Sequence, residues 1–145
     1  MALNFIPTWH ENPVARARVE KHLLQKHYKF LQVSVSGTQL TCKGSCQPTP
    51  LSIVYEYKLK YTPGRPPSVY TASPKIPYHK DIHMYPQDSS LCLYYPGDAS
   101  WNARSHLFDS VVPWAHEWFV FFELYQLTGE WKHPAVAHGQ NNKLK

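Results

Sequence analysis

Residues 31–72, LQVSVSGTQLTCKGSCQPTPLSIVYEYKLKYTPGRPPSVYTA, decide the fold, because apolar and polar side chains alternate along most of this stretch. A period of two places the apolar side chains on one face of a β-strand. Turn residues at Gly37 and between Gln47 and Pro50 separate three such runs: Leu31, Val33 and Val35; Leu40, Cys42 and Cys46; Leu51, Ile53, Tyr55, Tyr57 and Leu59. After a proline-rich turn, Ser68 to Ala72 suits a short fourth strand. The pattern predicts a four-stranded antiparallel meander.

A helix is expected before the strands. Asn12 can cap free amide donors, and Pro13 at the first helical position loses no hydrogen bond. The helix should run to about His27. Its apolar face is predicted by the spacing of Val19, Leu23 and His27, with Phe30 beyond, whereas Arg16, Glu20 and Lys26 mark other faces.

A second helix is expected after the strands, from Pro113 to a cap at Gly129. Its aromatic residues cover more than one face, which predicts a largely buried helix; they are Trp114, Trp118, Phe121, Phe122 and Tyr125. Between strands and helix, residues 73–112 carry four prolines and lack a long periodic segment. A long irregular segment within a compact domain is usually functional.

The composition fits one soluble α+β domain. The chain has 145 residues, of which 43% are hydrophobic, enough for one core and too interrupted for a membrane span. Residues 1–10 lack a basic segment followed by a long apolar run, so we expect a cytoplasmic protein without a secretory signal. The formal charge of +5 is spread along the chain without a basic and aromatic cluster, so no nucleic-acid partner is expected.

Cofactor chemistry is not indicated by the sequence. The nine histidines show no close pairing with carboxylates or thiols of the kind that holds a metal. No glycine-rich phosphate loop occurs, so the chain should not activate a substrate with ATP by itself. We expect no cofactor and no metal.

Two of the three cysteines are predicted to be structural. Cys42 and Cys46 are four residues apart, which on a continuous strand is about 13 Å, too far for a disulfide or for gripping one zinc ion. Only a tight turn at Gly44 would bring them together. Both thiols are therefore expected on the core side of a strand.

Cys92 is the third cysteine and lies within the irregular segment, flanked by Leu91 and Leu93. A thiol suits acyl transfer, because its thiolate attacks well and the resulting thioester stays reactive toward amines. The chemistry of the residues alone leaves two interpretations open, a catalytic nucleophile and a buried core cysteine. His83 and Tyr85 could donate hydrogen bonds to an oxyanion nearby, or could simply pack.

The element order resembles the ubiquitin-conjugating (UBC) fold: helix, four-stranded meander, long loop with one cysteine, buried helix. Ser90-Leu-Cys-Leu-Tyr94 is similar to the active-site segment of that superfamily. Trp101 falls near the sequence position of the tryptophan that follows this segment in the superfamily. More specifically, Pro113 to Glu123, Thr128 to Trp131 and His133-Pro134 resemble a prokaryotic branch, the stand-alone conjugation protein of bacterial CBASS anti-phage operons.

The resemblance implies a function as well as a fold. In this family the conjugating protein carries the C-terminus of a cGAS-like nucleotidyltransferase (CD-NTase) as a thioester on its cysteine, here Cys92, and passes it to an amine on a target protein. The implied effect is to prime cyclic-nucleotide signalling during phage infection. The expected conjugation domain covers residues 1–138, followed by a polar tail at 139–145.

Two departures from the family pattern affect this expectation. The usual oxyanion donor in the family is an asparagine eight residues before the cysteine, and this chain has Met84 at that position. His83 and Tyr85, on either side of Met84, are the candidates to replace it. We also expect no activating-enzyme domain of the kind that longer relatives fuse to the conjugation domain, as in the stand-alone form. The remaining alternatives are a non-catalytic UBC-like binding module, a thiol hydrolase using Cys92 with His83, and conjugation of a separate ubiquitin-like protein.

Overall fold

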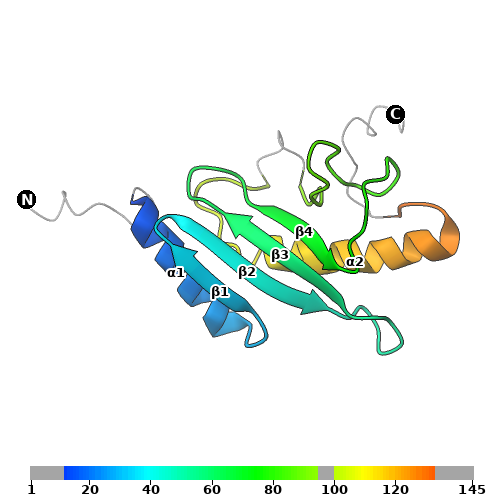
Figure 1. The fold of residues 1–145 in the computed structure, drawn as a ribbon, viewed down its shortest axis with the longest axis horizontal. Helices are drawn as coiled ribbons and strands as arrows, with labels where there is room; N and C mark the ends of the chain where they lie inside the picture. The colour runs from blue at the N-terminus through cyan, green and yellow to red at the C-terminus, as the bar shows by residue number, and fades with distance from the viewer. Residues whose placement is uncertain (1–11, 95–99, 133–145) are drawn as a thin grey trace, which may run out of the picture.

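The computed structural model describes residues 12–94 and 100–132. The elements follow the order α1 (Pro13–His27), β1 (Gln32–Ser36), β2 (Gln39–Cys46), β3 (Tyr55–Tyr61), β4 (Ser68–Ser73) and α2 (Val111–Thr128) (Figure 1). This is the expected α+β arrangement of a helix, a four-stranded sheet and a second helix. The expected tail at 139–145, and the domain boundary before it, lie outside the described residues.

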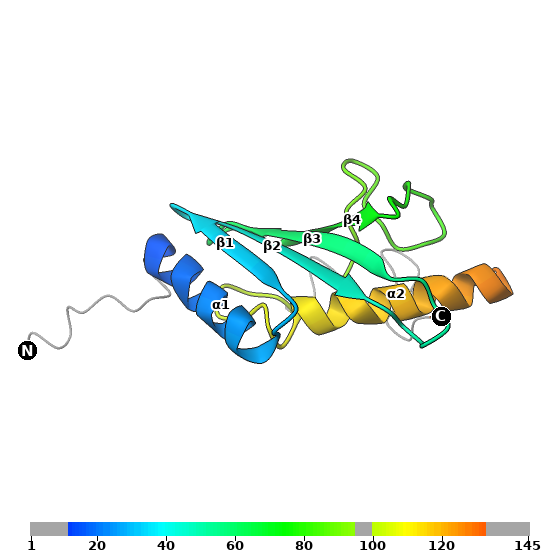
Figure 2. The same ribbon diagram turned by 60° about the horizontal axis from the view of Figure 1, so that its bottom comes forward.

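The four strands form one antiparallel sheet in the order β1-β2-β3-β4, as the alternation predicted. Both helices lie on the same side of the sheet, so its other face is left uncovered by helices (Figure 2). The core-side residues of β2 and β3 are among those predicted and are buried: Leu40, Cys42, Cys46, Tyr55, Tyr57 and Leu59. Among the described residues, no helix is long and apolar enough to cross a membrane.

The predicted start of β3 is wrong by several residues. Leu51 is 98% exposed and Ile53 is 57% exposed, and the strand begins only at Tyr55. The preceding residues form a turn, in which Thr49 N donates to Ser52 Oγ and Ser52 N donates to Thr49 O. Apolar parity alone does not tell a strand from a turn that happens to continue it.

α1 has the predicted ends but not the predicted core face. The Asn12 side chain caps the helix by accepting a hydrogen bond from Ala15 N at 3.1 Å. The buried residues are Arg16, Ala17, Glu20 and Leu24, whereas His27 is exposed. The apolar stripe therefore misidentified the inner face, because two charged residues occupy it.

Two charged residues of α1, Arg16 and Glu20, are buried because they bind one another and the chain after the cysteine segment. Arg16 Nε lies 3.0 Å from Glu20 Oε2, and the Arg16 guanidinium donates to the carbonyl oxygens of Ala103 and Ser105. Glu20 in turn accepts from Leu107 N at 2.9 Å and lies 2.7 Å from His106 Nδ1. Burying a charge is tolerated where it is paired and hydrogen-bonded, so this cluster ties residues 103–107 to α1.

α2 begins at Val111, two residues before the predicted start, and ends at the predicted cap, Gly129, which is left-handed at φ 79°. Only one side of the helix is buried, including Ala115, Trp118, Phe119 and Phe122. The expectation of a largely buried helix is thus corrected, because Leu127 is 82% exposed and Val120 and Leu124 are also exposed. On the buried side, Phe119 stacks on Tyr55 of β3, with ring centroids 4.9 Å apart.

We expect acid to destabilise the fold through His116 on α2. Its Nε2 lies 2.8 Å from the Tyr57 hydroxyl, and burial lowers its pKa below the ordinary 6.5. The unfolded chain then binds the proton more readily, so the stability that neutral His116 supplies is complete above that value and is lost as pH falls toward the folded pKa. Thermal melts from about pH 7.5 to about pH 5 should show a falling Tm, by roughly 4 °C per kcal/mol lost.

The variant His116→Gln checks this assignment, because glutamine cannot titrate but can still bond the Tyr57 hydroxyl. It should flatten the decline in Tm. The matched control is His22→Gln, since His22 is exposed on α1. An equally steep decline in His116→Gln would contradict the assignment.

Candidate active site

Cys92 lies on a short extended segment that backbone hydrogen bonds hold in place. Leu91 N donates to Val69 O on β4 at 2.8 Å, and Cys92 N donates to His83 O at 2.9 Å. Leu91 also forms an antiparallel bridge with Met84, and both side chains are buried. The segment is therefore anchored to β4, at the edge of the sheet, through Leu91 and through the pairing of Leu91 with Met84.

Asp88 stabilises the turn that connects Met84 to Leu91, the two residues of the bridge. Its Oδ1 accepts from Ser90 N at 2.9 Å and from Ser90 Oγ at 2.7 Å. Burial opposes ionisation of Asp88, but the hydrogen bonds from Ser90 outweigh it and lower the pKa of the carboxyl group. Asp88 is thus a structural carboxylate that orders the chain four residues before Cys92.

The three cysteines occupy different surroundings. Cys42 and Cys46 are buried on the core side of β2, as predicted, and burial raises the pKa of Cys42 to about 12 and that of Cys46, with help from the Glu123 charge, to about 11. Cys92 is partly exposed, with its thiol 3.8 Å from Tyr94 O. A thiol must reach solvent to react, so Cys92 is the candidate nucleophile among the three.

Tyr85, one of the two candidate oxyanion donors, lies next to the Cys92 side chain. Its hydroxyl donates to Tyr94 O at 3.2 Å. Burial is the main cause that raises the pKa of Tyr85, followed by the charge of Cys92 and a hydrogen bond between the two side chains. The phenol therefore stays protonated at neutral pH and keeps a proton to donate beside the thiol.

His83 reaches Cys92 through its backbone. Its carbonyl oxygen accepts from Cys92 N and from Trp118 Nε1, each at 2.9 Å. The imidazole packs on Trp131, with ring centroids 4.8 Å apart. A φ of 29° is uncommon for a residue with a side chain, and two hydrogen bonds on one carbonyl help to hold it. His83 thus positions the cysteine segment against α2.

Tyr94 is a site residue that the sequence analysis did not single out. Its hydroxyl donates to Pro67 O at 3.3 Å, and its pKa is raised to about 12, first by burial and then by the charge of Cys92. The signal for it was available, because residues 92 and 94 share a parity on an extended segment. What the sequence could not show was its contact with Pro67.

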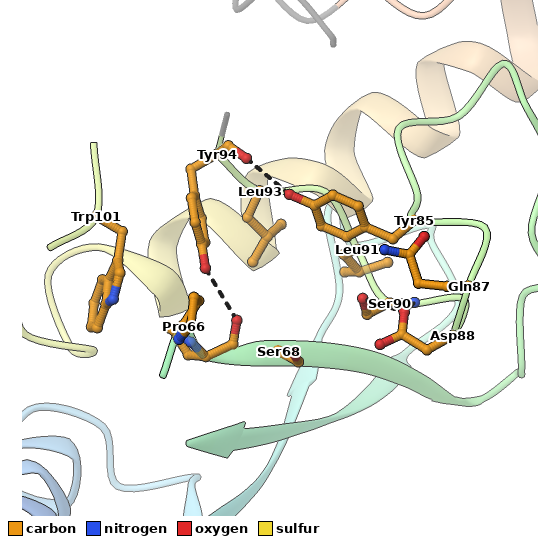
Figure 3. Close-up of a pocket in the computed structure, with 11 residues that line it drawn as sticks. Pro66, Ser68, Tyr85, Gln87, Asp88, Ser90, Leu91, Leu93, Tyr94 and Trp101 are labelled. Carbon is orange, nitrogen blue, oxygen red and sulfur yellow. Dashed lines mark hydrogen bonds between the residues drawn. The ribbon is translucent and has the colours of Figure 1, made fainter. Parts of the chain in front are cut away.

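A groove of about 350 Å³ runs along the cysteine segment. Figure 3 shows Trp101 at one end, Gln87 and Asp88 at the other, and Tyr94 and Tyr85 between them. Leu91 and Leu93, the two neighbours of Cys92, also line it. Within the described ranges 12–94 and 100–132, no three His, Cys, Asp or Glu side chains are grouped closely enough to hold a metal ion.

The geometry joins a partly exposed thiol, a protonated phenol and an apolar groove, a combination suited to acyl transfer. Comparison with known proteins identifies the family. Among curated proteins, none matches the chain well enough to count as a relative. Residues 20–139, most of the chain, match the sequence model of the family described as Type II CBASS E2 protein. The chain therefore belongs to this family of E2-like conjugation proteins of CBASS antiviral defence.

Proposed function

We propose that this protein is a UBC-fold acyl transferase in which Cys92 carries the C-terminus of a CD-NTase as a thioester and delivers it to an amine on a target protein. The observation that carries the proposal is the partly exposed Cys92 thiol beside the Tyr85 phenol, on a hydrogen-bonded segment of a CBASS E2 chain. The sheet and two helices support the UBC assignment.

The reaction has two acyl transfers. The Cys92 thiolate attacks the donor's terminal carbonyl, which arrives activated as a thioester or an acyl adenylate, and expels the activating group. An uncharged amine then attacks the Cys92 thioester, the thiolate leaves, and an amide forms with release of one proton. Both steps build negative charge on the carbonyl oxygen, which a fixed hydrogen-bond donor stabilises.

Tyr85 is our candidate for that donor. Met84, at the place of the family's usual asparagine, is buried and pairs with Leu91, so it anchors the segment instead. Tyr85 is the next residue, and its hydroxyl is close enough to Cys92 to share a hydrogen bond with it. A small rotation of the phenol would exchange Tyr94 O for the oxyanion as its acceptor.

The direct test incubates the protein with the CD-NTase encoded in its own operon and with whatever activating factor that operon supplies. We expect a band of combined mass on a non-reducing gel that disappears with a thiol reductant, and an amide-linked product that survives it. Free acid as the dominant product would instead identify a thiol hydrolase. Absence of any reductant-sensitive band would contradict the proposal.

Removing the last residue of the CD-NTase should lower the yield of the adduct at least about tenfold, because the carbonyl that Cys92 accepts is fixed by the donor's terminus. Gel densitometry of matched reactions measures the effect. The control is a CD-NTase variant with a disabled nucleotidyltransferase pocket and an intact terminus, which should conjugate normally. Conjugation of the truncated partner at the normal level would point to a different acyl donor.

A further inference from the structure

A hollow of about 390 Å³ lies on the face of the sheet that carries no helix. Figure 2 shows both helices below the sheet and this face open above them. Most of the lining comes from strand positions that alternate with buried ones: Gln32 of β1, Lys43 and Ser45 of β2, and Glu56 and Lys58 of β3. No residue of the cysteine segment lines the hollow, so it is separate from the candidate active site.

Two lysines face each other across the strands in this hollow. Lys43 of β2 and Lys58 of β3 are direct partners in the antiparallel register. Like charges directly opposite one another destabilise a sheet. The ion pairs formed within residues 12–94 and 100–132 include neither lysine. Strand pairing thus brings together two positive charges that are well separated in the sequence, and a bound anion would offset their repulsion.

The rest of the lining supplies hydrogen-bonding groups and one aromatic ring. Gln32 is the partner of Lys43 across β1 and β2, and its side-chain amide can donate to an anion. Phe30, two residues before β1, also lines the hollow and is 47% exposed. Its ring packs on those of Tyr28 and His116, with centroids 5.8 Å away in each case. A ring that is held in this way and remains exposed offers a surface for stacking.

We propose that this hollow binds a free nucleotide, with a phosphate group between Lys43 and Lys58 and the base near Phe30. The row of Ser45 and Glu56 lies two residues along the strands from the lysine pair, a step of about 6.6 Å, which suits the distance from a phosphate to its base. The Glu56 carboxylate there can accept from an amino group of the base. A volume near the lower end of the usual 300–1,000 Å³ for ligand sites fits one nucleotide.

An acidic segment of a partner protein is the competing occupant. Its carboxylates would also meet Lys43 and Lys58, but they would gain nothing from the Phe30 ring, and Glu56 would repel a run of them. The lining combines two cations, one carboxylate and one aromatic ring. This combination matches a ligand with an anionic end and a flat, uncharged end that donates hydrogen bonds.

The test is a titration of the ¹⁵N-labelled chain followed by NMR, with separate probes. The probes are AMP, GMP, adenosine, guanosine, inorganic phosphate, a hexanucleotide of RNA and hexaglutamate. We expect AMP or GMP to shift the amide signals of Phe30, Lys43 and Lys58. The Kd should be at least about tenfold below those of the matching nucleoside and of phosphate, because only the nucleotide engages both parts of the hollow.

The variant Lys58→Gln should weaken nucleotide binding about tenfold, because it removes one charged hydrogen-bond donor to phosphate. Its Tm should equal or exceed that of the wild type, since the repulsion from Lys43 is relieved. Phe30→Ala should weaken binding of the nucleotide and leave that of phosphate unchanged. The matched control is Lys26→Gln, which removes an exposed lysine of α1 outside the hollow and should leave every Kd unchanged.

Absence of shifts with both nucleotides, equal affinities for nucleotide and phosphate, tighter binding of hexaglutamate, or full affinity in folded Lys58→Gln would each overturn the inference. A hexanucleotide that binds more than about tenfold more tightly than AMP and GMP would overturn the assignment to a free nucleotide. These titrations involve no thioester chemistry, so their outcome is independent of the function proposed for Cys92.

Discussion

Cys92→Ala should abolish the reductant-sensitive adduct with the CD-NTase, while the variant folds like the wild type. Cys92 is the partly exposed cysteine, whereas the other two lie in the core. A thioester needs sulfur, so alanine leaves nothing to carry the acyl group, and the expected loss is complete within the sensitivity of the gel. The side chain is small and sits on a segment held by backbone hydrogen bonds, so circular dichroism and Tm should change little.

Cys42→Ala and Cys46→Ala are the matched controls. Their thiols lie on the core side of β2, and burial raises the pKa of both, so neither presents a thiolate at neutral pH. Each variant should lose some stability and keep the adduct. A normal adduct in Cys92→Ala would refute the central assignment, and loss of the adduct in a folded Cys42→Ala or Cys46→Ala would refute the structural role given to those residues.

Tyr85→Phe should slow discharge of the Cys92 thioester to a small amine by about a hundredfold, equivalent to roughly 3 kcal/mol in the barrier. The substitution keeps the ring and removes only the hydroxyl, which shares a hydrogen bond with Cys92 and donates to Tyr94 O. Single-turnover discharge of a preformed thioester measures the effect without contributions from donor activation. Formation of the thioester should be affected less, because an activated donor presents a lower barrier.

Tyr94→Phe is the matched control for Tyr85→Phe. It also removes one phenolic hydroxyl near Cys92, but that hydroxyl donates to Pro67 O across the groove. Its effect on discharge should be much smaller. His83→Ala, measured in parallel, tests His83, the second candidate hydrogen-bond donor to the oxyanion. If all three variants discharge within about threefold of the wild type, the oxyanion must be met by backbone amides near Cys92.

The sequence predicted the structure best where that structure depends on residues close together in the chain. Alternation in residues 31–72 identified four strands and the core side of β2 and β3, because neighbouring side chains on a strand point to opposite faces whatever surrounds it. Asn12 identified the start of α1, and Gly129 the end of α2, because caps depend on the residues of one helical turn. These local patterns did not decide whether Cys92 is a catalytic nucleophile or a buried core cysteine; its partial exposure is seen only in the structure.

The tertiary structure decided everything that joins distant residues. Arg16 and Glu20 lie on the inner face of α1 because their partners, at 103–107, come some 87 residues later in the chain. The groove beside Cys92 exists because the start of β4 lies opposite Tyr94, a contact 27 residues apart. Periodicity records which face of an element is apolar, but the partners that can neutralise a buried charge or close a groove are brought close only by the packing of the whole chain.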